Sequence, residues 1–171
     1  MLVIACSPLV ACSGGDDTSS TSVASTPATS DPADRLEVDL TLLDAAIAAL
    51  EDELGGPQRF FEINVQVGGI VNLFVAGDGT VTPWAYIDGE LSSIEPQPAE
   101  GATFPADAIE LDPDTAMAQV RAELPEAVEQ AFELIGGPDD TVRYTALMVS
   151  SGGSPILVEV AADGTIIGVD A

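Results

Sequence analysis

The sequence of 171 residues has no lysine and no histidine, and its only basic side chains are four arginines. Without imidazole or ammonium groups, the chain cannot build a Ser-His-Asp triad, a histidine-ligated metal site or a lysine Schiff base. The arginines are set against 29 acidic residues, and the formal net charge of −25 excludes a basic surface for nucleic acid. The two cysteines, Cys6 and Cys12, both lie near the start, so the rest of the chain has no thiol for a disulfide or a nucleophile.

Other features of catalytic sites are also missing. Aromatic side chains make up only 5% of the residues, which leaves few platforms for a sugar beside a carboxylate pair. Gly55-Gly56 and Gly136-Gly137 are each followed by proline, not by a helix that could hold phosphate at its N-terminus. Acidic pairs such as Asp139-Asp140 lack the spacing of a calcium loop, and we interpret them as caps and solvated faces; a calcium site is the alternative. We therefore expect no enzymatic activity, no cofactor and no metal.

The first twelve residues are apolar and end in Leu9-Val10-Ala11-Cys12. This ending resembles the bacterial lipoprotein signal, in which Leu, a small residue and Ala or Gly precede a cysteine. The resemblance implies cleavage between Ala11 and Cys12 and a lipid on the Cys12 thiol, which anchors the protein in the membrane. A short buried strand, or a disulfide between Cys6 and Cys12, is the alternative.

A signal peptide begins with a positively charged segment, and here only Met1 precedes the apolar run. We therefore expect a segment bearing Lys or Arg upstream of Met1. Residues 1–11 are then the signal peptide, and residues 12–30 are the acylated cysteine and a flexible tether rich in Ser, Thr and Asp. The expected location is outside the cytoplasm, lipid-anchored to the outer face of the cytoplasmic membrane.

Residues 31–171 contain pairs of similar short segments in the same order, and this repetition predicts a duplicated unit. The predicted units are residues 31–88 and 112–171, joined by a connector at 89–111. The matching pairs are Asp31-Pro32 with Asp112-Pro113, Leu54-Gly55-Gly56-Pro57 with Ile135-Gly136-Gly137-Pro138, Arg59-Phe60 with Arg143-Tyr144, Gly68-Gly69 with Gly152-Gly153, and Val75–Val81 with Val160–Ile166.

Each unit is predicted to hold one helix followed by three strands. Asp before Pro is typical of a helix start, and Gly-Gly-Pro of a helix end. Asp78-Gly79 and Asp163-Gly164 predict two-residue hairpins, and Leu91–Glu95 can add a short strand. The predicted class is α+β: two tandem helix–three-strand repeats, with a mostly antiparallel sheet and the helices packed on one face. The apolar positions that indicate these elements are Leu36, Leu40, Leu43, Ile47, Leu50 and Leu54 for the first helix, Met117, Val120, Leu124, Val128 and Ile135 for the second, kinked at Pro125, and Phe61, Ile63, Val65 and Val67 for the first strand.

This order of elements resembles the tandem modules of PepSY-like domains and of the secreted β-lactamase-inhibitor protein. The phrases that carry the resemblance are Trp84–Gly89 and Leu157–Gly164. The chain also resembles actinobacterial lipoproteins with an acidic Ser/Thr/Asp stretch after the lipid-bearing cysteine. The inhibitor protein has structural disulfides, whereas residues 31–171 have no cysteine, so the resemblance does not extend to inhibition.

Three aromatic residues, Phe74, Trp84 and Tyr86, form the candidate binding patch on neighbouring strands. A core layer beneath a helix is the alternative interpretation of the same residues. The sequence favours a monomeric, non-catalytic interaction module that binds a protein of the cell envelope. The alternatives are a carrier of a small or lipidic envelope ligand and a structural spacer. The negative charge repels nucleic acid and anionic headgroups, so we expect membrane contact only through the lipid on Cys12.

Overall fold

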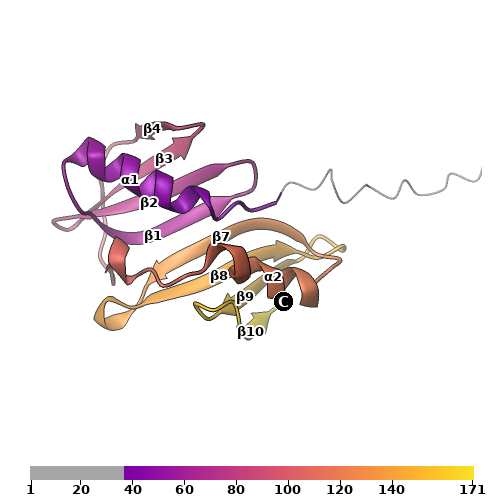
Figure 1. Cartoon of the computed structure of the whole chain (residues 1–171). Coiled ribbons are helices and arrows are strands. Elements are labelled where there is room, and N and C mark those ends of the chain that lie inside the picture. Colours follow the sequence, from indigo (N-terminus) through magenta and orange to yellow (C-terminus); the bar gives the residue numbers. More distant parts are fainter. Residues whose placement is uncertain (1–36) are drawn as a thin grey trace, which may run out of the picture. The chain divides into compact units, whose positions relative to one another are not determined.

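In the computed structural model, residues 37–171 are described, and their ten strands form one antiparallel sheet accompanied by two α-helices (Figure 1). The strands of the first half are β1 (Arg59–Gln66), β2 (Ile70–Gly77), β3 (Thr80–Ile87), β4 (Glu90–Ser93), β5 (Gln97–Pro98) and β6 (Phe104–Pro105). Those of the second half are β7 (Val128–Gly136), β8 (Val142–Val149), β9 (Pro155–Val160) and β10 (Ile166–Asp170). The helices are α1 (Leu42–Leu54) and α2 (Pro113–Glu123), and two short 3-10 turns, Ala106–Ala108 and Pro138–Asp140, complete the described elements.

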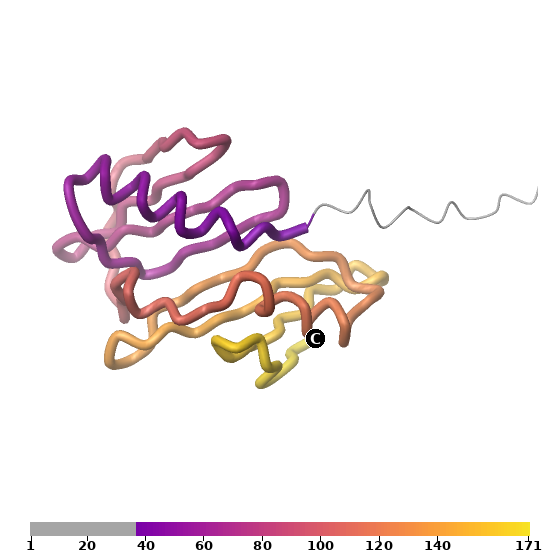
Figure 2. Tube along the Cα trace, viewed as in Figure 1, coloured from indigo at the N-terminus to yellow at the C-terminus, as the bar shows by residue number. Residues whose placement is uncertain are grey.

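The main path of the sheet has the strand order β10-β9-β8-β7-β1-β2-β3-β4. The antiparallel pairing of β1 with β7 joins the two halves in the middle of the sheet. The short strands β5 and β6 pair with β3 and β1. Figure 2 shows the chain leaving β4 and reaching α2 through the long segment that contains both short strands.

The helix α2 starts as the sequence predicts and ends earlier than predicted. The side chain of Asp112 accepts a hydrogen bond from the backbone N–H of Asp114, and Pro113 occupies the first turn. The helix stops at Glu123, two residues before Pro125, because proline lacks the N–H that the next turn needs. Residues Val128–Gly136, which we expected to continue the helix, form the strand β7 instead.

The predicted fold of two tandem helix–three-strand repeats is wrong, although the α+β class fits in part. The structure is dominated by one sheet of ten strands. An additional hairpin follows β3, because Asp88 and Gly89 both adopt positive φ (52° and 85°), as a two-residue turn of type I′ requires. The matched Gly-Gly-Pro phrases end different elements: the first follows α1, and the second follows β7. Gly-Gly-Pro can follow a helix or a strand, so its recurrence in the sequence did not show that the two halves have matching elements.

Two further turns test the hairpin predictions. The turn at Asp78-Gly79 joins β2 to β3 with Gly77 opposite Thr80, so the predicted two-residue hairpin is confirmed. The turn at Asp163-Gly164 is longer than predicted, because the nearest paired residues are Val160 and Ile166. The predicted helix start at Asp31-Pro32 and the apolar position Leu36 lie outside the described residues.

The hydrophobic core lies between the helices and one face of the sheet, and both helices lie on that face (Figure 1). On β1 a register shift between Phe60 and Glu62 places Phe60, rather than the predicted Phe61, in the core. Among residues 37–171, no helix is long and apolar enough to cross a membrane. The largest fully buried side chains are Phe60, Phe104, Phe132, Leu50, Ile63, Leu73, Met117, Leu134 and Met148.

Candidate functional site: the helix-free face of the sheet

The face of the sheet opposite the helices carries a row of polar residues that crosses its middle. Residues directly opposite each other on antiparallel strands point to the same face, so the register identifies the members of the row. Asn64 lies between Asn72 on β2 and Glu133 on β7, and the row continues through Thr145 on β8 to Glu159 on β9. We call these five residues the central polar row.

Two mostly apolar rows lie on either side of the central polar row. Their side chains face away from the helices, yet many are aliphatic or aromatic, and the side chains of Leu157 and Ile87 are 44% and 42% exposed. When one face of an antiparallel sheet is exposed to water, the residues on that face are usually polar. One row consists of Leu157, Leu147, Ala131, Gln66, Ile70 and Ile87, and the other of Arg143, Ile135, Glu62, Phe74 and Pro83.

Two glutamates near the centre of this face, Glu62 and Glu133, lie close together, and no arginine of residues 37–171 forms an ion pair with them. The Nδ2 of Asn64 donates a hydrogen bond of 3.3 Å to Oε1 of Glu133, while the buried Oδ1 of Asn64 has no partner among the described residues. Partial burial raises the pKa of Glu62, repulsion from Glu133 raises it further, and a hydrogen bond from Asn64 opposes the shift. The charged form of Glu62 is therefore held at a cost in the folded protein.

The arginines of the described residues do not neutralise this pair of glutamates. Arg59 forms an ion pair with Asp140, and Arg121 with Glu129 and Glu37. Arg143 lies at the rim of the same face and has no ion pair within residues 37–171. Within residues 37–171, the centre of the helix-free face is thus acidic and has no compensating charge.

The structure does not bring the three predicted patch residues onto one face. Trp84 pairs with Leu73, and Tyr86 with Val71, so both aromatic side chains point to the helix-bearing face, where they are half-buried against the core. Phe74 pairs with Pro83 and points to the helix-free face. The predicted lipidation and cleavage residues, Cys12 and Ala11, lie outside the described residues.

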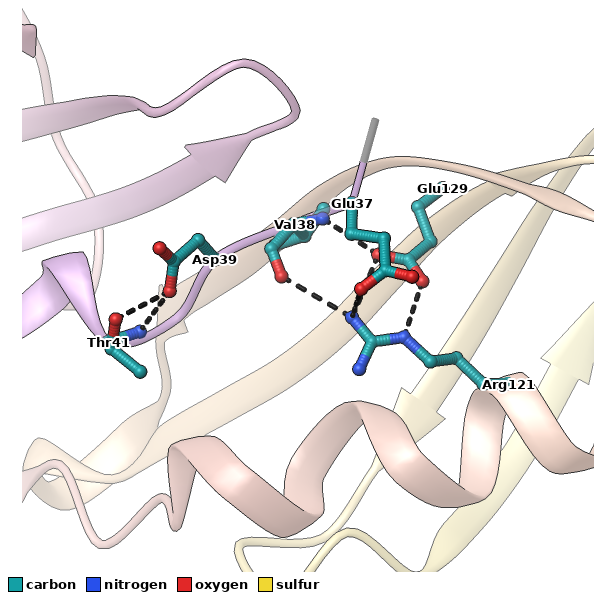
Figure 3. A network of polar contacts seen from close by, with 6 residues as sticks. All are labelled: Glu37, Val38, Asp39, Thr41, Arg121 and Glu129. Carbon is teal, nitrogen blue, oxygen red and sulfur yellow. Dashed lines mark hydrogen bonds and ion pairs between the residues drawn. The ribbon is translucent and has the colours of Figure 1, made fainter. Parts of the chain in front are cut away.

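A second polar cluster lies on the helix-bearing side and ties the start of the described chain to the second half (Figure 3). Arg121 on α2 donates from Nε to Oε1 of Glu129 at 2.6 Å and from Nη2 to Oε2 at 3.2 Å. Oε2 of Glu129 also accepts from the backbone N–H of Val38 at 2.8 Å, and Arg121 donates to the carbonyl of Val38 at 3.4 Å. Glu129 is only 8% exposed, and both of its carboxylate oxygens accept hydrogen bonds from these donors. This cluster joins the segment before α1 to α2 and to β7.

Sequence reasoning placed part of the candidate site on one face of a strand but did not single it out as a site. The predicted alternation of Phe61, Ile63, Val65 and Val67 leaves Glu62, Asn64 and Gln66 at the positions between them, and these three therefore share the other face of the strand. Glu133 was missed because we assigned its segment to a helix, and only the register of β1 with β7 places it beside Asn64. Among residues 37–171, no group of three or more His, Cys, Asp or Glu side chains is arranged to hold a metal ion.

Comparison with known proteins gives a likeness in fold only. The chain matches no protein-family model and no curated relative. It is similar to a solved structure named "putative lipoprotein (CD1622)" from Clostridium difficile 630, with a TM-score of 0.53 and 14% sequence identity. The match covers 78% of this chain and 94% of the other. At this identity the similarity shows the fold and carries no residue-level role.

Proposed function

We propose that this protein is a lipid-anchored, extracytoplasmic interaction module without catalytic activity. The lipid-anchor part of the proposal is supported by the phrase Leu9-Val10-Ala11-Cys12 and by the fold shared with a protein that is itself named a lipoprotein. The outer face of the cytoplasmic membrane is the location that such an anchor implies. The similarity to PepSY-like modules, to the β-lactamase-inhibitor protein and to actinobacterial lipoproteins stays a prediction from the strand-turn phrases.

The interaction part rests on one observation, the amphipathic character of the helix-free face. Exposed and half-buried apolar side chains, among them Leu157, Leu147 and Ile87, lie in a row beside polar ones, although the helices leave this face open. Burying such a surface against a partner removes apolar area from water and is favourable. A spacer has no need of this surface.

A carrier would need an enclosed apolar cavity between the helices and the sheet. That space is occupied by large, fully buried side chains, including Phe60, Phe104 and Phe132. A hollow of about 410 Å³ beside the core-facing Tyr144 is lined by charged residues such as Arg143 and Glu110 as well as by apolar ones. We therefore favour the interaction module over the carrier.

The lipid anchor is tested by mass spectrometry of the N-terminal peptide isolated from native cells. A diacylglyceryl group on Cys12 and the absence of residues 1–11 are expected, and Cys12→Ser should leave the protein outside the membrane fraction. An unmodified Cys12 in a chain that still carries residues 1–11 would refute the anchor.

The interaction role is tested by crosslinking in intact native cells, followed by mass spectrometry of the attached proteins. One dominant partner is expected for the wild type, and replacement of Leu157 by Glu on the helix-free face should reduce its yield. Leu54→Glu is the matched control, because Leu54 is similarly exposed, at 41%, but lies at the end of α1. A partner captured equally by all three proteins, or no partner at all, would refute the role assigned to this face.

A further inference from the structure

We propose that the helix-free face docks a basic, amphipathic segment of a partner protein, with an arginine or lysine side chain above Glu62, Asn64 and Glu133. The apolar side chains of that segment would lie over Phe74, Ile135 and Leu147. This inference rests on the interaction role proposed above and specifies the chemistry of the partner.

The polar centre of the face has hydrogen-bond acceptors and negative charges that a cationic donor could pair with. Two glutamates flank Asn64, and the Nδ2 of Asn64 donates a hydrogen bond of 3.3 Å to Glu133. The oxygen of the same amide has no donor within the described residues. A guanidinium group carries five N–H donors and a positive charge, so it can bind two carboxylates at once. Partial burial of Glu62 strengthens that attraction because the site is less well solvated than open water.

The negative charge of the protein restricts which macromolecule can bind to the helix-free face. A second copy of this chain carries the same glutamates on this face and the same net charge of −25, so face-to-face docking is opposed by repulsion. The segment before residue 37 does not fit either, since residues 13–36 contain four aspartates and a single arginine. Anionic lipid headgroups and nucleic acid are repelled by the net charge of −25. A basic protein segment is the remaining macromolecular partner with complementary charge.

The apolar rows make the site selective among basic partners. Ile135 and Phe74 lie directly opposite Glu62 on the two neighbouring strands, and Leu147 lies on β8 beside the central polar row. These side chains are half-buried and face away from the helices. An extended segment that alternates basic and apolar residues can therefore place both kinds of side chain at once, whereas a purely basic segment loses the apolar contacts.

Fluorescence anisotropy with a short labelled peptide, in which arginine alternates with valine, tests the inference on the purified full chain in detergent. The double variant Glu62→Gln/Glu133→Gln is expected to bind about tenfold more weakly, the effect of losing a desolvated charge contact. The control Asp52→Asn/Glu53→Gln removes two exposed carboxylates of α1 and causes the same change in net charge. We expect the control to bind within about twofold of the wild type.

Three results would overturn the inference. The first is an equal loss of peptide affinity in both double variants, which would indicate attraction to net charge alone. The second is equal binding of a peptide with serine in place of valine. The third is no binding of the arginine-valine peptide by the wild type at low salt. Thermal unfolding of each variant confirms that the fold persists, and Leu147→Ser provides a second route, since it should weaken binding without any change in charge. A cellular partner that is lost with Leu157→Glu but not with Glu62→Gln/Glu133→Gln would leave the interaction role standing and refute only the basic chemistry.

Discussion

Arg121 on α2 and Glu129 on β7 form a two-point ion pair whose carboxylate also receives the backbone N–H of Val38 (Figure 3). The cluster connects three parts of the chain: the segment before α1, the second helix and a central strand. Glu129 is the one charged side chain of residues 37–171 that is buried. Its burial is tolerated because both carboxylate oxygens accept hydrogen bonds and Arg121 supplies the opposite charge.

Replacement of Arg121 by Leu is expected to reduce the free energy of unfolding by about 3 kcal/mol, because it leaves the buried Glu129 carboxylate without its cation. The double replacement Arg121→Leu/Glu129→Leu should recover most of this loss, since no charge is then left unpaired. Denaturant unfolding followed by circular dichroism gives both values. Arg143→Leu is the control, with an expected change within about 0.5 kcal/mol at an exposed position. A double variant as unstable as the single one would contradict the explanation.

Two glycines with nearly the same φ are expected to respond differently to replacement by alanine. Gly153 and Gly164 have φ of 83° and 84°, so either substitution strains the backbone by about 1 kcal/mol. A Cβ at Gly153 would meet no atom within 4 Å, whereas one at Gly164 would lie 2.7 Å from the carbonyl oxygen of Thr115 on α2. We expect Gly164→Ala to cost about 3 kcal/mol in total, because the turn must move away from the helix. Thermal denaturation of the two variants measures the difference, and equal costs would show that the turn does not rest on α2.

The Glu62→Gln variant is expected to be more stable than the wild type at neutral pH. The folded-state pKa of Glu62 is raised above its ordinary value of 4.5, so the folded protein holds this proton more tightly than the unfolded chain does. Stability of the wild type therefore falls as the pH rises from below 4.5 through the folded-state pKa, and Gln avoids that loss. Below the unfolded pKa, the two proteins should converge. Urea unfolding at several pH values tests this, and an advantage of Gln that is the same at acidic and neutral pH would contradict it.

Local patterns predicted several elements because their signals depend on neighbours in the chain. The helix α1 buries Leu43, Ile47 and Leu50 at the expected spacing, and Val71, Leu73 and Val75 alternate into the core on β2. Spacing alone could not decide the segment 128–136, since its apolar residues fit one side of a helix as well as one side of a strand. Pro125 and the pairing with β1 decide for the strand.

The candidate site depends on which residues of β1 and β7 lie opposite each other, and the local sequence of neither strand specifies that pairing. Asn64 and Glu133 lie 69 residues apart and meet only because β7 pairs with β1 in one alignment. A shift by one residue would send every side chain of the strand to the other face. The same limit explains the aromatic residues: Phe74 and Trp84 lie on neighbouring strands, but their alignment places them on opposite faces.

We expect Trp84→Ala to reduce mainly the stability of the fold, and Phe74→Ser to weaken mainly the binding of the peptide. Trp84 is half-buried against the core on the helix-bearing face, so its loss should reduce the free energy of unfolding by about 2 kcal/mol. Phe74 lies on the helix-free face beside Glu62, so its replacement should weaken binding of the arginine-valine peptide while costing less stability. Thermal unfolding and fluorescence anisotropy on the same two variants measure both effects. If Trp84→Ala, still folded, also loses peptide binding, then the binding surface includes the helix-bearing face and the original aromatic patch is the better description.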